Sequence, residues 1–111
     1  MRNMDAPDAH LRDEARLQRR KRRLLAKGSD VAKQLETLMN GLEVDLLNLP
    51  PPRLPDEDPL LRLRRFLDII DRGIKACGTP AFGRCRTCGV PLDAAVLDEA
   101  PWTERCPAHR D

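Results

Sequence analysis

Three cysteines and one histidine near the end of the chain have the types and the spacing of metal ligands. Cys85 and Cys88 form one pair separated by two residues, and after a spacer of seventeen residues Cys106 and His109 form a second pair. Two such pairs let four soft donors close a tetrahedron around one ion, and Gly89 permits the sharp turn after the first pair. Three thiolates and an imidazole suit zinc better than Mg²⁺, Ca²⁺ or Mn²⁺. The sequence therefore predicts one structural Zn²⁺ site.

Two other interpretations of these residues have less support. A redox pair at Cys85 and Cys88 needs a βαβ context, and no such pattern surrounds it. A catalytic zinc keeps one position open for water, whereas four protein ligands fill the shell here and no further Glu or His is placed as a general base. We therefore expect no enzymatic activity. The fourth thiol, Cys77, continues an apolar helical seam and is predicted to be a small buried hydrophobic residue.

The composition predicts a single, mostly α-helical domain. The chain has 111 residues, of which 34% are charged and only 3% are aromatic, so few large side chains are present to fill a wide core. Such a chain is typical of long helices with narrow apolar seams. No apolar run approaches the length of a membrane span and the N-terminus has no export signal, so we expect a cytoplasmic protein without a membrane segment.

The first helix is predicted over about residues 6–40. Asp5 is its expected N-cap, Pro7 falls in its first turn, and Asn40 with Gly41 forms its expected end. Gly28 leaves open whether the helix is broken there, but apolar residues keep a heptad spacing through it and favour one long helix. The seam comprises Leu17, Leu24, Val31 and Leu38, with Leu35 and Leu42 at its second position.

A proline-rich connector is predicted over residues 42–58, because its four prolines cannot continue a helix. Asp58 and Pro59 then form a helix start, and the second helix is predicted over residues 59–77, closed by Gly78. Its apolar seam comprises Leu60, Leu63, Leu67, Ile70, Ile74 and Cys77. Its outward side comprises Arg62, Arg65, Asp68, Arg72 and Lys75.

A single helix cannot bury such a seam alone, so the two helices are predicted to pair as an antiparallel, coiled-coil-like hairpin. The helical region then covers residues 1–79, and a Cys3His zinc finger covers residues 80–111. Burying six Leu- or Ile-sized side chains would supply on the order of 10 kcal/mol before conformational entropy is counted. We therefore expect the zinc finger to stabilise the open end of the hairpin.

The zinc-finger segment resembles the C-terminal finger of the DksA/TraR family. The resemblance rests on Gly83 to Pro91, on Leu97 to Trp102 and on Cys106 to His109. It implies a bacterial transcription regulator that inserts a helical hairpin into the secondary channel of RNA polymerase and presents acidic residues near the active site. His109 stands where the family usually has a cysteine, which is a conservative change for a zinc ligand.

The family's acidic signature, D-x-x-D-x-A, has two candidate counterparts in this chain. Asp5 and Asp8 match its first two positions at the N-terminus, where the short members of the family carry theirs. The long members carry theirs at the hairpin tip. The acidic residues in the connector are Asp45, Asp56, Glu57 and Asp58. Helix capping explains either cluster at least as well.

A basic cluster in the first helix comprises Arg19, Arg20, Lys21, Arg22 and Arg23. The formal net charge is only +2, so no global field favours nucleic acid, and we expect the stretch from residue 16 to residue 27 to be mostly exposed. These side chains would either be solvated or contact phosphates or an acidic protein rim. The rival function is therefore a zinc-stapled protein-interaction adaptor or a nonspecific DNA-associated protein. The oligomeric state stays open.

Overall fold

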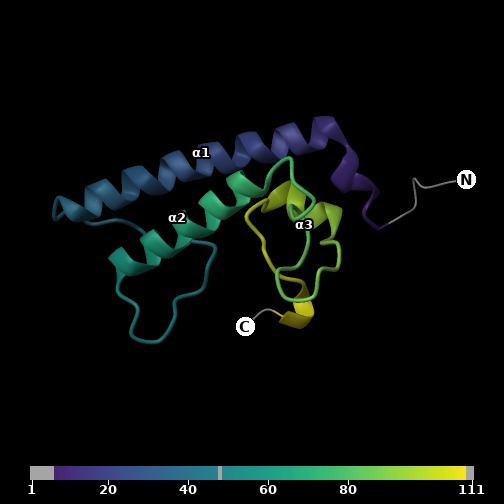
Figure 1. The fold of residues 1–111 in the computed structure, drawn as a ribbon. Helices are drawn as coiled ribbons and strands as arrows, with labels where there is room; N and C mark the ends of the chain where they lie inside the picture. Colours follow the sequence, from purple (N-terminus) through teal and green to yellow (C-terminus); the bar gives the residue numbers. More distant parts are fainter. Residues whose placement is uncertain (1–6, 48, 110–111) are drawn as a thin grey trace, which may run out of the picture.

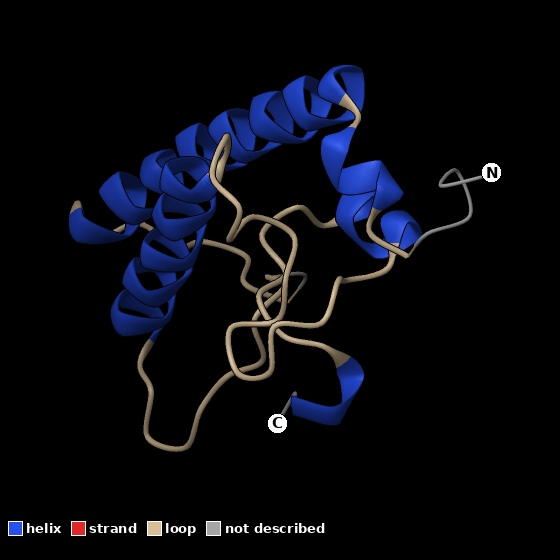
Figure 2. Ribbon diagram, turned by 45° about the vertical axis from the view of Figure 1, so that its right-hand side comes forward, coloured by secondary structure: helices blue, strands red, loops and turns tan. Residues whose placement is uncertain are grey.

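A computed structural model of the protein describes residues 7–47 and 49–109. Figure 1 shows a long helix, α1, along one edge of the molecule, with α2 and the shorter α3 both on the same side of it. The described residues form helices and no strand, with one isolated antiparallel bridge between Arg84 and Pro91 (Figure 2). In chain order, the elements are the 3₁₀-helix η2 (Ala9–Arg12), α1 (Glu14–Met39), α2 (Pro59–Ala76), α3 (Ala94–Glu99) and the 3₁₀-helix η3 (Pro107–His109).

Helix α1 starts later than the sequence predicts. Asp13 is its N-cap, and the Asp13 carboxylate accepts a hydrogen bond from the Arg16 amide at 3.2 Å. The expected start near residue 6 is wrong because Asp13 supplies the capping oxygen and η2 precedes it; Asp5 lies outside the described residues. The predicted end is confirmed, since Asn40 is the C-cap and Gly41 has a φ of 81°.

Gly28 lies inside α1 and does not break it, because the helix is continuous from Glu14 to Met39. A Cβ at Gly28 would lie 3.3 Å from Cγ2 of Ile70, and a Cβ at Gly73 would lie 3.1 Å from Cδ2 of Leu24. Each glycine thus faces a large side chain of the other helix. The glycines allow α1 and α2 to approach closely, which explains why helix-weakening residues occur within both helices.

The main core lies between α1 and α2, and α2 runs back alongside α1 (Figure 1). Four residues of the predicted seams are buried in this core, six are partly buried and pack against it, and Leu60 and Leu42 are not part of it. Phe66, which the heptad pattern omits, is fully buried, whereas Leu67 is only partly buried. Leu42, which the pattern includes, is 61% exposed because Gly41 has already ended the helix. The buried side chains of this core are Leu24, Val31, Leu49, Leu63, Phe66, Ile70 and Phe82.

The connector between the helices is fastened to α2 by two arginines that the sequence places on the outward side. The guanidinium of Arg62 donates hydrogen bonds to the backbone carbonyls of Leu46, Leu49 and Pro51, at 2.9 to 3.2 Å. A proline-rich segment has few backbone N–H groups but keeps all its carbonyls, so a five-donor guanidinium matches it. The outward side of α2 is therefore partly a binding surface for the connector.

Glu57, near the end of the connector, binds both Arg65 of α2 and the connector backbone. Its side chain is 8% exposed and accepts hydrogen bonds from Arg65 Nε at 2.6 Å, from Arg65 Nη2 at 3.0 Å and from the Leu54 amide at 3.0 Å. The hydrogen bonds from Arg65 outweigh burial and lower the pKa of Glu57 to about 2. The carboxylate is therefore charged at neutral pH and holds the connector against α2.

Replacement of Glu57 by Gln should destabilise the protein in a pH-dependent way. A carboxyl group whose pKa falls from 4.5 to about 2 on folding contributes stability above pH 4.5 and loses it as the pH falls towards 2. Urea unfolding of the wild-type protein and of Glu57→Gln should therefore differ at pH 6 and converge at low pH. The matched control is Glu43→Gln at an exposed position. An equal difference between wild type and Glu57→Gln at every pH would contradict this assignment.

No helix in the described part of the chain is long and apolar enough to cross a membrane.

Candidate metal centre

The first ligand pair lies in a tight turn. The Gly89 amide donates to the Cys85 carbonyl at 2.8 Å, and the Cys85 amide donates to the Val90 carbonyl at 2.9 Å. Gly89 has a φ of 78°, a conformation that favours glycine, so the predicted need for a glycine after the first pair is confirmed. The turn presents the side chains of Cys85 and Cys88 from one short loop.

The second pair lies at η3, where the His109 amide donates to the Cys106 carbonyl at 2.9 Å. All four ligand atoms lie within 4.8 Å of one another. Sγ of Cys85 is 3.7 Å from Nδ1 of His109, Sγ of Cys88 is 3.7 Å from Sγ of Cys106, and Sγ of Cys106 is 3.1 Å from Nδ1 of His109. A tetrahedral zinc with ordinary Zn–S and Zn–N bonds has edges of roughly 3.5–3.8 Å. Two of the separations match these edges and one is shorter, so the four atoms lie close enough together to hold a metal ion.

The protonation of the thiols also favours a bound cation. Burial raises the pKa of Cys85, but hydrogen bonds from the backbone of Cys106, Cys88 and Thr87 outweigh it and lower the pKa to about 5. The backbone of Val90 lowers the pKa of Cys88, but burial and the neighbouring Cys85 and Cys106 side chains outweigh it and raise the pKa. The pKa values of the two thiols in the first pair are thus shifted in opposite directions, and Cys85 is the one that is held as a thiolate at neutral pH. A divalent cation bound by the group would favour the thiolate form of both.

The N-terminal segment covers one side of the ligand cluster. Leu11 of η2 packs on the small core formed by Cys85, Leu92, Leu97 and Cys106. The Asp8 carboxylate pairs with Arg84 at 3.1 Å, and His10 Nε2 donates to the Leu92 carbonyl at 2.9 Å. Burial and the nearby Arg20 lower the pKa of His10, so the ring stays neutral at neutral pH. The sequence analysis gives His10 no role, and no local pattern indicates this long-range contact.

The segment of residues 80–109, which carries the four clustered side chains, is called the metal unit below. Helix α1 is joined to this unit through a buried arginine. The Arg20 side chain is 1% exposed, its Nε donates to Oδ1 of Asp98 at 2.8 Å, and its Nη2 lies 2.7 Å from the same oxygen. Arg23 Nη2 donates to the Glu99 carbonyl at the end of α3. A buried guanidinium is tolerated only when it is paired. Arg20 therefore has a structural role, and the expectation that the whole basic cluster is mostly exposed is wrong at this position.

Helix α2 is joined to the metal unit by an aromatic pair and a charged one. Trp102 meets Phe66 edge to face, with ring centroids 5.6 Å apart, and Lys27 Nζ lies 5.7 Å from the Trp102 ring centroid. Arg72 binds the Glu104 carboxylate through two hydrogen bonds of 2.7 and 3.1 Å. Because the Arg86 amide also donates to the Glu104 carbonyl, Glu104 connects α2 to the turn that carries Cys85 and Cys88.

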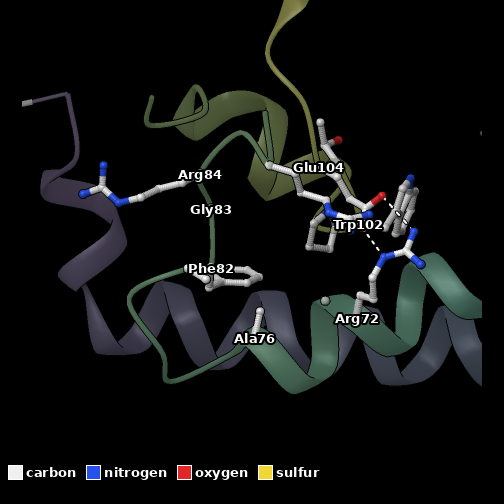
Figure 3. A pocket seen from close by; sticks show the side chains of 12 residues that line it. Arg72, Ala76, Phe82, Gly83, Arg84, Trp102 and Glu104 are labelled. Carbon is white, nitrogen blue, oxygen red and sulfur yellow. Dashed lines mark hydrogen bonds and ion pairs between the residues drawn. The ribbon is translucent and has the colours of Figure 1, made fainter. Parts of the chain in front are cut away.

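A cavity of about 170 Å³ lies between these contacts. Figure 3 shows Ala76 and Phe82 on one side and Trp102 on the other, with the Arg72 and Glu104 side chains joined at the rim. The charged groups that line it are already paired, Arg72 and Arg86 with Glu104, and Arg84 with Asp8. The cavity therefore belongs to the joint between α2 and the metal unit.

Most acidic candidates already have intramolecular partners. The Asp8 carboxylate contacts Arg12 and Arg84, and Glu57 is the buried partner of Arg65. Asp58 caps α2 by accepting from the Leu61 amide at 2.8 Å, so helix capping is its observed role. Asp45 is exposed, and its side chain accepts from the Leu47 amide at 2.9 Å. Asp56 is exposed at a φ of 63°. The described candidates do not converge on one acidic group.

The rest of the basic cluster lies partly on the surface and partly against the metal unit. Arg19 and Arg22 are exposed and make no ion pair within the described residues, and Lys21 is half-buried. The charges therefore point in several directions, as expected for five consecutive helical residues. The sequence did not indicate the contacts of Arg20, Trp102 and Glu104, because each joins segments that are distant along the chain.

Comparison with known proteins identifies no relative: no family model, no curated protein and no solved structure matches the chain.

Zinc content should depend on the four predicted ligands and not on Cys77, the thiol outside that group. We expect one zinc per chain for the wild type and for Cys77→Ser, and substantially less for Cys106→Ser, because Cys77 is not among the clustered ligands. Elemental analysis after dialysis measures this. A structural zinc is worth about 10–16 kcal/mol in small finger peptides, so a strong chelator should also unfold the metal unit in circular dichroism. Loss of zinc from Cys77→Ser would contradict the ligand assignment.

Substitution of Gly83 should destabilise the joint between η2 and the metal unit. Gly83 has a φ of 79°, and a Cβ there would overlap Cδ2 of Leu11 and lie 3.1 Å from Cδ1 of Leu97. Gly78 has a φ of 85° but no atom within 4 Å of the added Cβ, so Gly78→Ala is the matched control. Both variants carry backbone strain of about 1–2 kcal/mol, and Gly83→Ala adds overpacking of about 1–3 kcal/mol. Equal unfolding free energies would contradict this reasoning.

Proposed function

We propose that this protein is a zinc-binding, DksA/TraR-like transcription regulator that binds bacterial RNA polymerase in the cytoplasm. The observation that carries the proposal is the convergence of four ligand atoms within 4.8 Å at the residues that carry the resemblance to that family. The spacing in the sequence and the proximity of the four ligand atoms both support one metal-binding group, which this proposal takes to be a zinc finger. The polymerase as partner rests on the resemblance alone.

Zinc would be held by Cys85, Cys88, Cys106 and His109 and would act as a structural ion. Four protein ligands leave no open position, so the ion supplies cross-linking and charge neutralisation and activates no water. The residues around it position the finger against the helices: Asp98 binds Arg20, and Glu104 binds Arg72. In this proposal the finger fixes the base of a helical hairpin formed by α1 and α2.

The connector end of the hairpin would be the part that acts inside the polymerase. It joins the end of α1 to the start of α2 (Figure 1), and its residues 50–52 and 54 line a cavity together with Val96 and Trp102 of the metal unit. Asp45 and Asp56 are the candidate acidic residues that remain exposed there, because Glu57 and Asp58 are engaged within the fold. These two carboxylates would perturb the active centre electrostatically, and the exposed Arg19 and Arg22 of α1 would meet acidic rims of the enzyme.

The second candidate is a zinc-stapled adaptor that has the finger without the polymerase function. The intramolecular partners of Asp8, Glu57 and Asp58 favour it, because they leave few carboxylates for an acidic tip. An adaptor would use the exposed helix surfaces to bind protein, or the basic face of α1 to contact nucleic acid nonspecifically.

Competitive binding tests the polymerase proposal. The zinc-loaded protein should bind bacterial RNA polymerase core and be displaced by a known secondary-channel factor. The double variant Asp45→Asn, Asp56→Asn should still fold and bind, because both asparagines keep the side-chain oxygen and tolerate a positive φ. It should lose its effect on transcription, because both negative charges are removed. Asp30→Asn, at an exposed position of α1, is the control. Binding that the competitor does not displace, or none at all, would favour the adaptor.

A further inference from the structure

One side of α1 is unpartnered and carries a second, outward heptad pattern. Leu25, Ala32 and Met39 are spaced by seven residues, so they share one side of the helix. All three are exposed, and of the two large side chains Leu25 is 50% exposed and Met39 is 61% exposed. This side is distinct from the one that packs on α2 through Leu24 and Val31.

Charged residues flank this apolar stripe with opposite signs at its two ends. Arg22, Ser29 and Glu36 are also spaced by seven, each three residues before a member of the stripe, and all three are exposed. Arg22 and Glu36 make no ion pair within the described residues. Arg22 thus supplies a positive charge near the beginning of the face and Glu36 a negative charge near its end, with the small residues Ser29 and Ala32 in the middle.

We propose that this face of α1 binds the same face of a second copy of the chain, with the two helices antiparallel. A two-fold axis between residues 30 and 31 places Ser29 opposite Ala32 of the second copy and Leu25 beside Glu36 of the second copy. Arg22 then lies one turn from that same glutamate, so each basic end meets an acidic end. The exposed parts of Leu25 and Met39 are buried between the helices.

The charge pattern selects the antiparallel arrangement over the parallel one. In a parallel pair in register, Arg22 would face Arg22 and Glu36 would face Glu36, and both contacts would be repulsive. Only antiparallel pairing satisfies both charges with one symmetric interface. The face lies outside the contacts that α1 makes with α2 and Asp98, so the proposal does not depend on the proposed function.

Sedimentation equilibrium of the zinc-loaded full chain tests the pairing. The wild type should shift with concentration from 12.6 kDa towards twice that mass. Leu25→Glu should weaken the association about tenfold or more, because an apolar contact is lost and the new carboxylate lies beside Glu36 of the second copy. The matched control is Leu61→Glu, because Leu61 is 52% exposed on α2 and lies outside the face. A wild type that stays monomeric, or equal effects of the two variants, would overturn the proposal.

A charge swap tests the orientation. Arg22→Glu and Glu36→Arg should each weaken the dimer, and the double variant should restore it, because the two charges exchange places across the same interface. Arg64→Glu, at an exposed position of α2, makes the same charge change as Arg22→Glu and should have no effect. Zinc content and helicity should be unchanged in all variants. A double variant weaker than either single one would overturn antiparallel pairing.

Discussion

The structure depends on the convergence of Cys85, Cys88, Cys106 and His109, because the metal unit has almost no core of its own. Its regular structure is limited to α3 and η3, and its buried apolar side chains beside the ligands are Leu92 and Leu97. So small a core cannot offset the entropy of ordering the segment, and the buried sulfurs oppose shared negative charge. A divalent cation held by these four side chains would offset both costs. Its binding would therefore be coupled to folding of the segment.

The metal unit in turn completes the helical pair. The contacts on both helices come from residues that the ligands hold in place: Asp98 neutralises the buried Arg20 of α1, and Trp102 covers Phe66 of α2. Without Asp98, the Arg20 guanidinium would be a buried charge with no partner, which is far costlier than an exposed one. Removal of a bound ion should therefore destabilise α1 and α2 as well, because the contacts of Asp98 and Trp102 with these helices would be weakened.

Local signals predicted the parts of the fold that local chemistry determines. The bounds of α2 followed from Asp58 and Pro59, and the metal ligands followed from two short pairs, because each signal lies within a few residues. The start of α1 was missed because two capping signals compete and Asp13 wins. The burial of Arg20 could not be predicted, since its partner lies 78 residues away and a charged residue in a basic run gives no indication of burial.

Charge use in this fold explains which surfaces remain available for partners. Near the metal unit, Arg20, Arg72 and Arg84 are all neutralised within the chain. At the connector, Glu57 is neutralised as well. Along α1, Arg19, Arg22 and Glu36 are exposed and make no ion pair within the described residues. Because the paired charges are already neutralised, these unpaired charges of both signs are the ones that remain available to a partner.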